Sequence, residues 1–122
     1  MATDMSGFIF KIGFKKEDSF VFFGVEHKIT VKIKAYYQED GMTDEQISAY
    51  EYYLTNKCDI QAKVENIISE SDYDRETLKP TMLTIRCDGE IALMIQDSND
   101  YDGGLAAVIS PELKLLTQDE YL

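Results

Sequence analysis

The sequence predicts an α+β domain, because three patterns follow one another along the chain. Between residues 8 and 37 apolar and polar side chains alternate with the two-residue period of strands. Between residues 44 and 68 apolar side chains recur every three or four residues, as on amphipathic helices. From residue 81 the period returns to two around an Asp-Gly turn. We therefore expect an N-terminal antiparallel meander, two amphipathic helices, and a C-terminal β-hairpin with further short strands.

The N-terminal meander is predicted to contain three strands. The first covers residues 8–14, where apolar side chains alternate on one face, and the polar run of residues 15–18 provides a turn after it. Residues 19–24 are apolar on both faces, as in a central strand. The third strand covers residues 28–37, where lysines alternate with apolar side chains.

The two helices are predicted from capping and periodicity. Thr43 precedes a helix over residues 44–56, and Gln46 three residues later completes a capping box. A second helix opens at Asp59. We expect the two helices to cover a face of the N-terminal sheet. The apolar side chains expected to face it are Ile47, Tyr50, Tyr53 and Leu54 in the first helix, and Ile60, Val64, Ile67 and Ile68 in the second.

The C-terminal hairpin allows its register to be predicted. Pro80 ends any preceding helix, and the hairpin spans residues 81–96. A two-residue loop would mix the apolar pattern, whereas a three-residue loop of residues 87–89 with a left-handed Gly89 pairs Arg86 with Glu90. That register gathers on one face the side chains of Leu83, Ile85, Ile91, Leu93 and Ile95. A polar loop over residues 97–104, a buried strand over 105–109 and a last strand over 113–117 follow.

Length and charge restrict the class of protein. The chain of 122 residues and 14.0 kDa predicts a single domain spanning residues 1–122. Twelve bases against 23 acids give a net charge of −11, so we expect a basic protein partner, no nucleic acid and no membrane. Residues 1–40 carry six Lys and six acids, so the whole excess of acids lies in residues 41–122. The sequence carries no signal of oligomeric state.

The chain ends and the cysteines predict a cytoplasmic protein. The first six residues contain an acid and no basic n-region, and no apolar stretch has the length of a spanning helix. Cys58 and Cys87 lie 29 positions apart without CxxC spacing, so we expect two reduced thiols and no disulfide. No lipidation motif or retention motif closes the sequence.

Few residues have the chemistry of a catalytic or metal site. His27 is the only histidine and begins an alternating strand, which is typical of a structural residue. Zinc would require His27 to meet Cys58, Cys87 and an acid, and none of them has local ligand spacing. We therefore predict no catalytic residue, no metal and no cofactor.

The loop over residues 97–104 is the best candidate for a cation site, because Asp97, Asp100 and Asp102 supply hard oxygen ligands. Its spacing does not fit a calcium loop, which favours a solvated turn before a buried strand and leaves the cation site as an alternative. As a partner-binding surface we select the acids of this loop and of the preceding acidic stretch, together with one tyrosine. They are Asp72, Asp74, Asp97, Asp100, Asp102 and Tyr101.

The C-terminal third resembles a group of small uncharacterised bacterial domains. The resemblance runs from Leu78-Lys79-Pro80 through Asp88-Gly89 and the acidic loop 97–102 to the strand 104–109 and the closing residues 118–122, with weaker similarity in the helix 43–54. It implies small, acidic, cytoplasmic proteins without a catalytic site, such as the immunity proteins of polymorphic toxin systems.

Three functions are therefore compared. The leading hypothesis is a non-catalytic protein-binding module that neutralises a basic toxin or enzyme domain. The alternative is an intracellular bacterial protein of another role, whose acidity serves solubility. The third is a divalent-cation-dependent hydrolase using the acids of residues 97–102.

Overall fold

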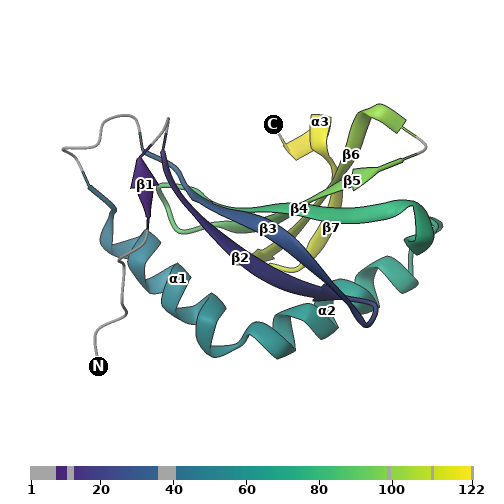
Figure 1. Cartoon of the computed structure of the whole chain (residues 1–122), viewed down its shortest axis with the longest axis horizontal. Helices are drawn as coiled ribbons and strands as arrows, with labels where there is room; N and C mark the ends of the chain where they lie inside the picture. The colour runs from purple at the N-terminus through teal and green to yellow at the C-terminus, as the bar shows by residue number, and fades with distance from the viewer. Residues whose placement is uncertain (1–7, 11–12, 36–40, 99, 111, 122) are drawn as a thin grey trace.

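The computed structural model describes residues 8–10, 13–35, 41–98, 100–110 and 112–121, and for residues 10, 100–103 and 119 the backbone alone. Within them the strands form one seven-stranded sheet in the order β1-β2-β3-β4-β5-β6-β7. Two helices lie along one face of the sheet (Figure 1). The elements in chain order are β1 (Ile9–Phe10), β2 (Phe14–Phe22), β3 (Val25–Ile33), α1 (Asp44–Thr55), α2 (Lys57–Ser69), η2 (Arg75–Thr77), β4 (Leu78–Ile85), β5 (Ile91–Asp97), β6 (Asp100–Ser110), β7 (Lys114–Thr117) and α3 (Gln118–Tyr121). The predicted α+β class is confirmed.

The N-terminal strands form the predicted antiparallel meander, but one turn was placed wrongly. Residues 15–18 lie inside β2 and not in a turn, and the first strand ends at Phe10 rather than continuing to Phe14. The turn between β2 and β3 is formed by Phe23 and Gly24, which have φ angles of 49° and 79°. Positive φ at both positions is the geometry of a tight two-residue hairpin turn.

The helices follow the predicted capping. Thr43 Oγ1 accepts a hydrogen bond from the Gln46 backbone N–H at 3.1 Å, and Gln46 Oε1 accepts one from the Thr43 N–H at 2.9 Å. Helix α2 begins at Lys57, two residues before the predicted start. Of the predicted apolar faces, Tyr50, Tyr53, Ile60, Val64 and Ile68 are buried and Ile47 and Ile67 are half-buried. The prediction for Leu54 was wrong, since its side chain is exposed.

Strands β3 and β4 are parallel, and the helices lie between them in the chain. Gln46 is fully buried where these two strands end. Its Nε2 donates to the Lys34 carbonyl at 2.6 Å and to the Ile85 carbonyl at 3.5 Å. The amide N–H of Lys34 donates to the same Ile85 carbonyl at 3.0 Å. One side chain therefore fixes the start of α1 against both strands.

The β4–β5 hairpin has the predicted three-residue loop. The Arg86 N–H donates to the Glu90 carbonyl at 2.9 Å, the Gly89 N–H donates to the Arg86 carbonyl at 2.8 Å, and Gly89 has a φ of 92°. Ile85 lies opposite Ile91 and Leu83 opposite Leu93, all of them buried. Strand β4 starts three residues earlier than predicted.

Pro80 lies within β4 opposite Ile95, directly before a register shift, and not at the end of a helix. Proline is tolerated at such an irregularity because its missing N–H is not needed for the ladder there.

The polar loop predicted over residues 97–104 is wrong. Strand β5 continues to Asp97, which pairs with Asp100, the first residue of β6. The strand predicted at 105–109 is the inner part of β6, and the last predicted strand corresponds to β7. The unpredicted helix α3 places Tyr121 on the face of the sheet opposite to α1 and α2, against Ala92, Ala106 and Val108.

Polar contacts join the helices to the first hairpin. Asp18 points from β2 toward the helices, where its carboxylate accepts hydrogen bonds from Tyr53 Oη at 3.0 Å and from Lys57 Nζ at 3.1 Å. Burial, followed by the nearby Asp18 charge, raises the pKa of Tyr53 well above its ordinary value. Cys58 and Cys87 are free, as predicted, and the structure shows that both are exposed. No helix in the described part of the chain is long and apolar enough to cross a membrane.

Leu93→Ala should lower the free energy of unfolding by about 2–5 kcal/mol, because it leaves a cavity between the sheet and the helices. Ile67→Ala should cost less, since Ile67 is only half-buried. Urea unfolding measures both. A Leu93→Ala midpoint equal to that of the unmodified protein would contradict the placement of this side chain in the core.

Gly89→Ala should destabilise the protein more than Gly24→Ala. Both glycines have positive φ, which costs roughly 1–2 kcal/mol for alanine. A Cβ at Gly89 would also lie 3.0 Å from the Glu45 carbonyl oxygen, whereas a Cβ at Gly24 meets nothing within 4 Å. Thermal unfolding of the two variants compares them directly, and equal losses would show that the hairpin does not press against α1.

Candidate interaction surfaces

The sheet brings two of the predicted acidic segments to one end of the molecule. Residues 72–74 lie in the connection between α2 and β4, and Asp97 ends β5. Leu78, the first residue of β4, pairs with Asp97, and the Ser98 N–H donates to the Thr77 carbonyl at 2.8 Å. This acidic end lies on the right in Figure 1, where α2, the start of β4 and the β5–β6 turn meet.

The predicted residues differ in what they do there. Asp74 Oδ1 accepts a hydrogen bond from the Glu76 N–H at 2.9 Å and so caps the short helix η2. Asp72 is exposed, and Asp97 is half-buried. Asp100, Tyr101 and Asp102 lie in β6, and their side chains fall outside the part of the chain that the structure describes. The topology therefore brings the two segments together, and the Asp72 side chain is exposed there.

A shallow hollow of about 510 Å³ adjoins this acidic end. Its apolar lining comes from α2 and β7, and its polar lining comes from the connection after α2. The lining residues are Ile67, Glu70, Ser71, Asp72, Tyr73 and Leu115. Sequence analysis missed this site because Leu115 is far from the acidic stretch in the chain. The mixture of a tyrosine with serines and acids over residues 69–74 was the available signal.

The shape of the hollow is set by Ser71. Its hydroxyl donates to the Ile68 carbonyl at the end of α2 and accepts the Tyr73 N–H at 3.2 Å. The Tyr73 side chain remains 43% exposed beside the hollow. An exposed aromatic ring next to carboxylates is a suitable contact for the aliphatic stem and charged end of a basic side chain.

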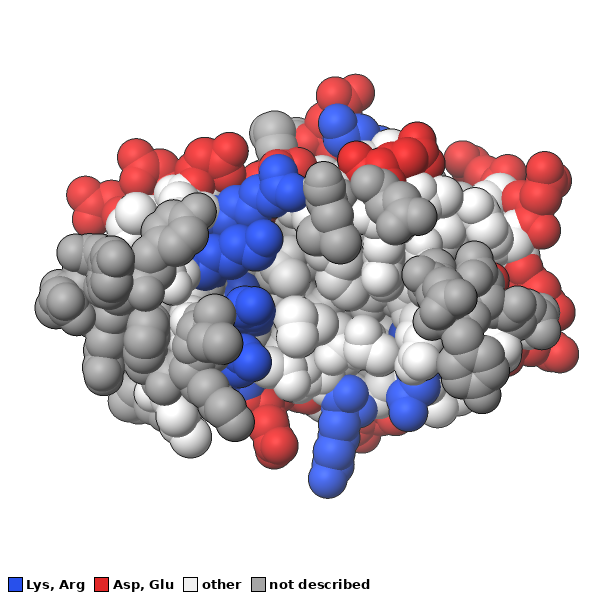
Figure 2. All heavy atoms as spheres, turned by 90° about the horizontal axis from the view of Figure 1, so that it is seen from above, with Lys and Arg blue, Asp and Glu red and all other residues white. Residues whose placement is uncertain are grey.

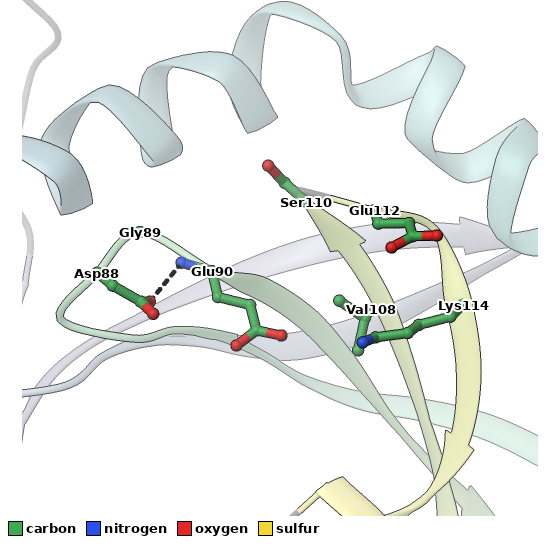
Figure 3. A pocket seen from close by; sticks show the side chains of 7 residues that line it. All are labelled: Asp88, Gly89, Glu90, Val108, Ser110, Glu112 and Lys114. Carbon is green, nitrogen blue, oxygen red and sulfur yellow. Dashed lines mark hydrogen bonds between the residues drawn. The ribbon is translucent and has the colours of Figure 1, made fainter.

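A second hollow, of about 300 Å³, lies at the opposite end of β4 and β5 (Figure 3). Figure 3 shows the side chains of Glu90 and Lys114 extending over Val108 into the same space, while Ser110 points toward the helices. Asp88 accepts the Glu90 N–H at 3.0 Å. The remaining lining residues are Gly89 and Glu112. This hollow combines both signs of charge.

Arg86 borders the second hollow and fixes the C-terminal helix. Its guanidinium lies 4.2 Å from the centre of the Tyr121 ring and donates to the Tyr121 carbonyl at 2.9 Å. It also lies 3.4 Å from Glu90 Oε2. Burial raises the pKa of Tyr121, and Glu90 adds to that effect.

Among the described residues, no three His, Cys, Asp or Glu side chains gather in a group that could hold a metal. His27 contacts the ring of Phe22, with 6.2 Å between ring centres. Of the three carboxylates proposed for a cation, only the side chain of Asp97 is described.

Comparison with known proteins found no matching family model, no matching curated protein and no matching solved structure.

Calcium should not stabilise the protein. A ligand that binds only the folded state raises the melting temperature by mass action. Asp97 pairs with Asp100 across neighbouring strands, so we expect the same melting temperature in EDTA and in millimolar calcium. A rise of several degrees that Asp97→Asn abolishes would instead support the cation site and the hydrolase alternative.

Proposed function

We propose that this domain is a non-catalytic protein-binding module that captures a basic partner at its acidic end, in the manner of an immunity protein that neutralises a toxin or enzyme domain. The observation that supports the proposal is the hollow beside the acidic end. It combines exposed carboxylates, an exposed tyrosine and an apolar floor in one place.

The lining of the hollow matches the chemistry of an arginine or lysine side chain. Ile67 and Leu115 offer apolar surface for the methylene stem, and Tyr73 offers a ring face. Glu70 and Asp72 stand at the rim, where they would meet the charged group. Tyrosine and arginine are both enriched among the residues that contribute most of the binding energy at protein interfaces.

The surrounding charge favours the encounter with such a partner. The chain has a net charge of −11, and the acids of residues 72–74 and Asp97 lie at one end. Asp100 and Asp102 belong to the strand that starts there and add two further negative charges. Such a field accelerates association with a basic surface and is screened by salt.

The test measures separately the effect of the acidic charges on association and the effect of contacts in the hollow on dissociation. The partner is isolated from extracts of the source cells with the full chain as bait and is then purified, and association is followed by stopped flow. Asp72→Asn combined with Glu70→Gln should slow association several-fold at low salt and much less at 0.5 M salt, where the Debye length is about 4–5 Å. Tyr73→Ala should mainly speed dissociation, because it removes a packed contact.

Asp59→Asn is the matched control, because it removes a carboxylate from the other end of the same helix. It lies eleven residues from Glu70, roughly 16 Å along a helix. It should leave both rates nearly unchanged. The proposal fails if the partner whose association depends on Glu70 and Asp72 is acidic, or if the control slows association as much as the paired change, as the solubility alternative predicts.

A further inference from the structure

The pairing of the strands places basic side chains at both ends of one row that crosses the sheet from β2 to β7. Lys15 on β2 lies opposite Lys32 on β3, and Lys32 lies beside Thr84 on β4. The same row continues through the next strands to β7. Its remaining members in order are Ala92, Val108 and Lys114. Cations therefore stand at both ends of a row whose middle consists of small, buried side chains.

This row lies on the outer face of the sheet, which is the face opposite to α1 and α2. The neighbours of the row in β3, β4 and β5 are Val31, Leu83 and Leu93, which are fully buried in the core under the helices. Because side chains alternate along a strand, the row itself points to the other side. Figure 2 looks onto this face and shows Lys and Arg forming a band across it, with acids around the rim.

Two further cations extend the row. Lys34 follows β3 and donates its N–H to Ile85, so it lies beside Arg86 at the end of β4. Arg86 stacks on Tyr121, which covers Ala92 and Val108. We call these residues the basic band: Lys15, Lys32, Lys34, Arg86 and Lys114. From β2 to β7 it crosses five strand spacings, or roughly 24 Å.

The basic band is unfavourable for the isolated domain. Lys15 and Lys32 are directly opposed, and like charges in that position destabilise a sheet. Burial lowers the pKa of Lys32, and the charges of Lys15 and Lys34 lower it further. Among the described carboxylates, Glu90 alone forms an ion pair with a member of the band, namely Arg86. A chain with 23 acids thus gathers five cations on one face, and among the described residues one of them, Arg86, has an ion-pair partner.

Apolar side chains lie beside the basic band on the same face. Met82 lies opposite Met94, and Met94 and Leu116 pack on the small residues of β5 and β6. All three are half-buried, so part of each side chain remains open to a ligand. A surface with cations in a line and methionines beside it suits a ligand that carries both acidic and apolar groups.

We propose that the outer face of the sheet is a docking surface for an acidic segment of another protein, whose carboxylates lie on the basic band and whose apolar side chains cover Met82, Met94 and Leu116. A polynucleotide fits this surface less well. The only aromatic ring among the described residues of this face, that of Tyr121, is buried and offers no platform for base stacking.

The proposal is tested with a labelled peptide of sequence Glu-Leu-Glu-Ala-Glu-Leu-Glu-Ala, measured by fluorescence anisotropy with the full chain. The peptide should bind at 20 mM salt and lose affinity about tenfold at 200 mM, because the screening length shortens. Combining Lys15→Gln with Lys32→Gln should weaken binding at least fivefold. Lys63→Gln, which removes an exposed lysine of α2 on the other face of the sheet, is the control and should leave affinity unchanged.

Two further probes decide the class of ligand. The same peptide with Gln in place of Glu should not bind, and a five-nucleotide single strand with four phosphates should bind more weakly than the acidic peptide. The proposal is overturned if the uncharged peptide binds equally, if the band variant binds like the control, or if the oligonucleotide binds more tightly through the same lysines. These binding experiments do not involve Glu70, Asp72 or Tyr73. A negative result would therefore overturn the docking surface on the sheet without deciding the function proposed for the acidic end.

A measurement on the free protein tests the premise. Lys32→Gln should raise the melting temperature at neutral pH and low salt, because it relieves repulsion from Lys15 and Lys34. Since the folded pKa of Lys32 lies below that of the unfolded chain, the destabilisation by its charge disappears as the pH rises through the folded pKa. The gain should therefore shrink toward about pH 10. If Lys32→Gln instead lowers the melting temperature at neutral pH, the charge of Lys32 does not destabilise the free domain, and the premise of the proposal is wrong.

Discussion

Strands β3 and β4 run parallel at the centre of a sheet whose other neighbours are all antiparallel, and the buried amide of Gln46 holds them at one end. Its Nε2 reaches the carbonyls of Lys34 and Ile85, while its Oε1 caps α1 at Thr43. Loss of the amide would remove one donor from each carbonyl and would also remove the Gln46 half of the α1 capping box. The joining of two antiparallel halves into one sheet, and with it the position of each charged surface, depends on this contact.

Local rules predicted the elements that local interactions determine. The capping pair at Thr43 and the bulged hairpin at Gly89 lie within a few residues of their partners, and both were read correctly from the sequence. Residues 15–18 were misread because their polarity resembles a turn. Asp18 faces the helices to receive Tyr53 and Lys57, and a contact across 35 positions leaves no periodic signal. The turn at Phe23 was also missed, because phenylalanine is rare at a positive φ.

The candidate surfaces likewise divide into features that the local sequence predicts and features that only the fold brings together. The acidic segments were found from composition, and their meeting at one end follows from the pairing of Leu78 with Asp97. The hollow beside them also needs Leu115, which only the fold brings near Ile67. The charge count of the sequence did not reveal the basic band, because the six lysines of residues 1–40 are balanced by six acids. In space, strand alternation separates those charges: Lys15 and Lys32 point outward, while Asp18 points toward the helices.

The parallel contact also sets an order of folding events. The β2–β3 and β4–β5 hairpins join neighbours in the chain, and such hairpins form in about 1–10 μs. Ile33 and Ile85 are paired although 52 positions separate them, so closing this contact carries the largest loss of chain entropy in the sheet. Each half exposes an apolar face until α1 and α2 settle across the junction. The time between hairpin formation and closure is therefore when the chain is most open to association with other copies.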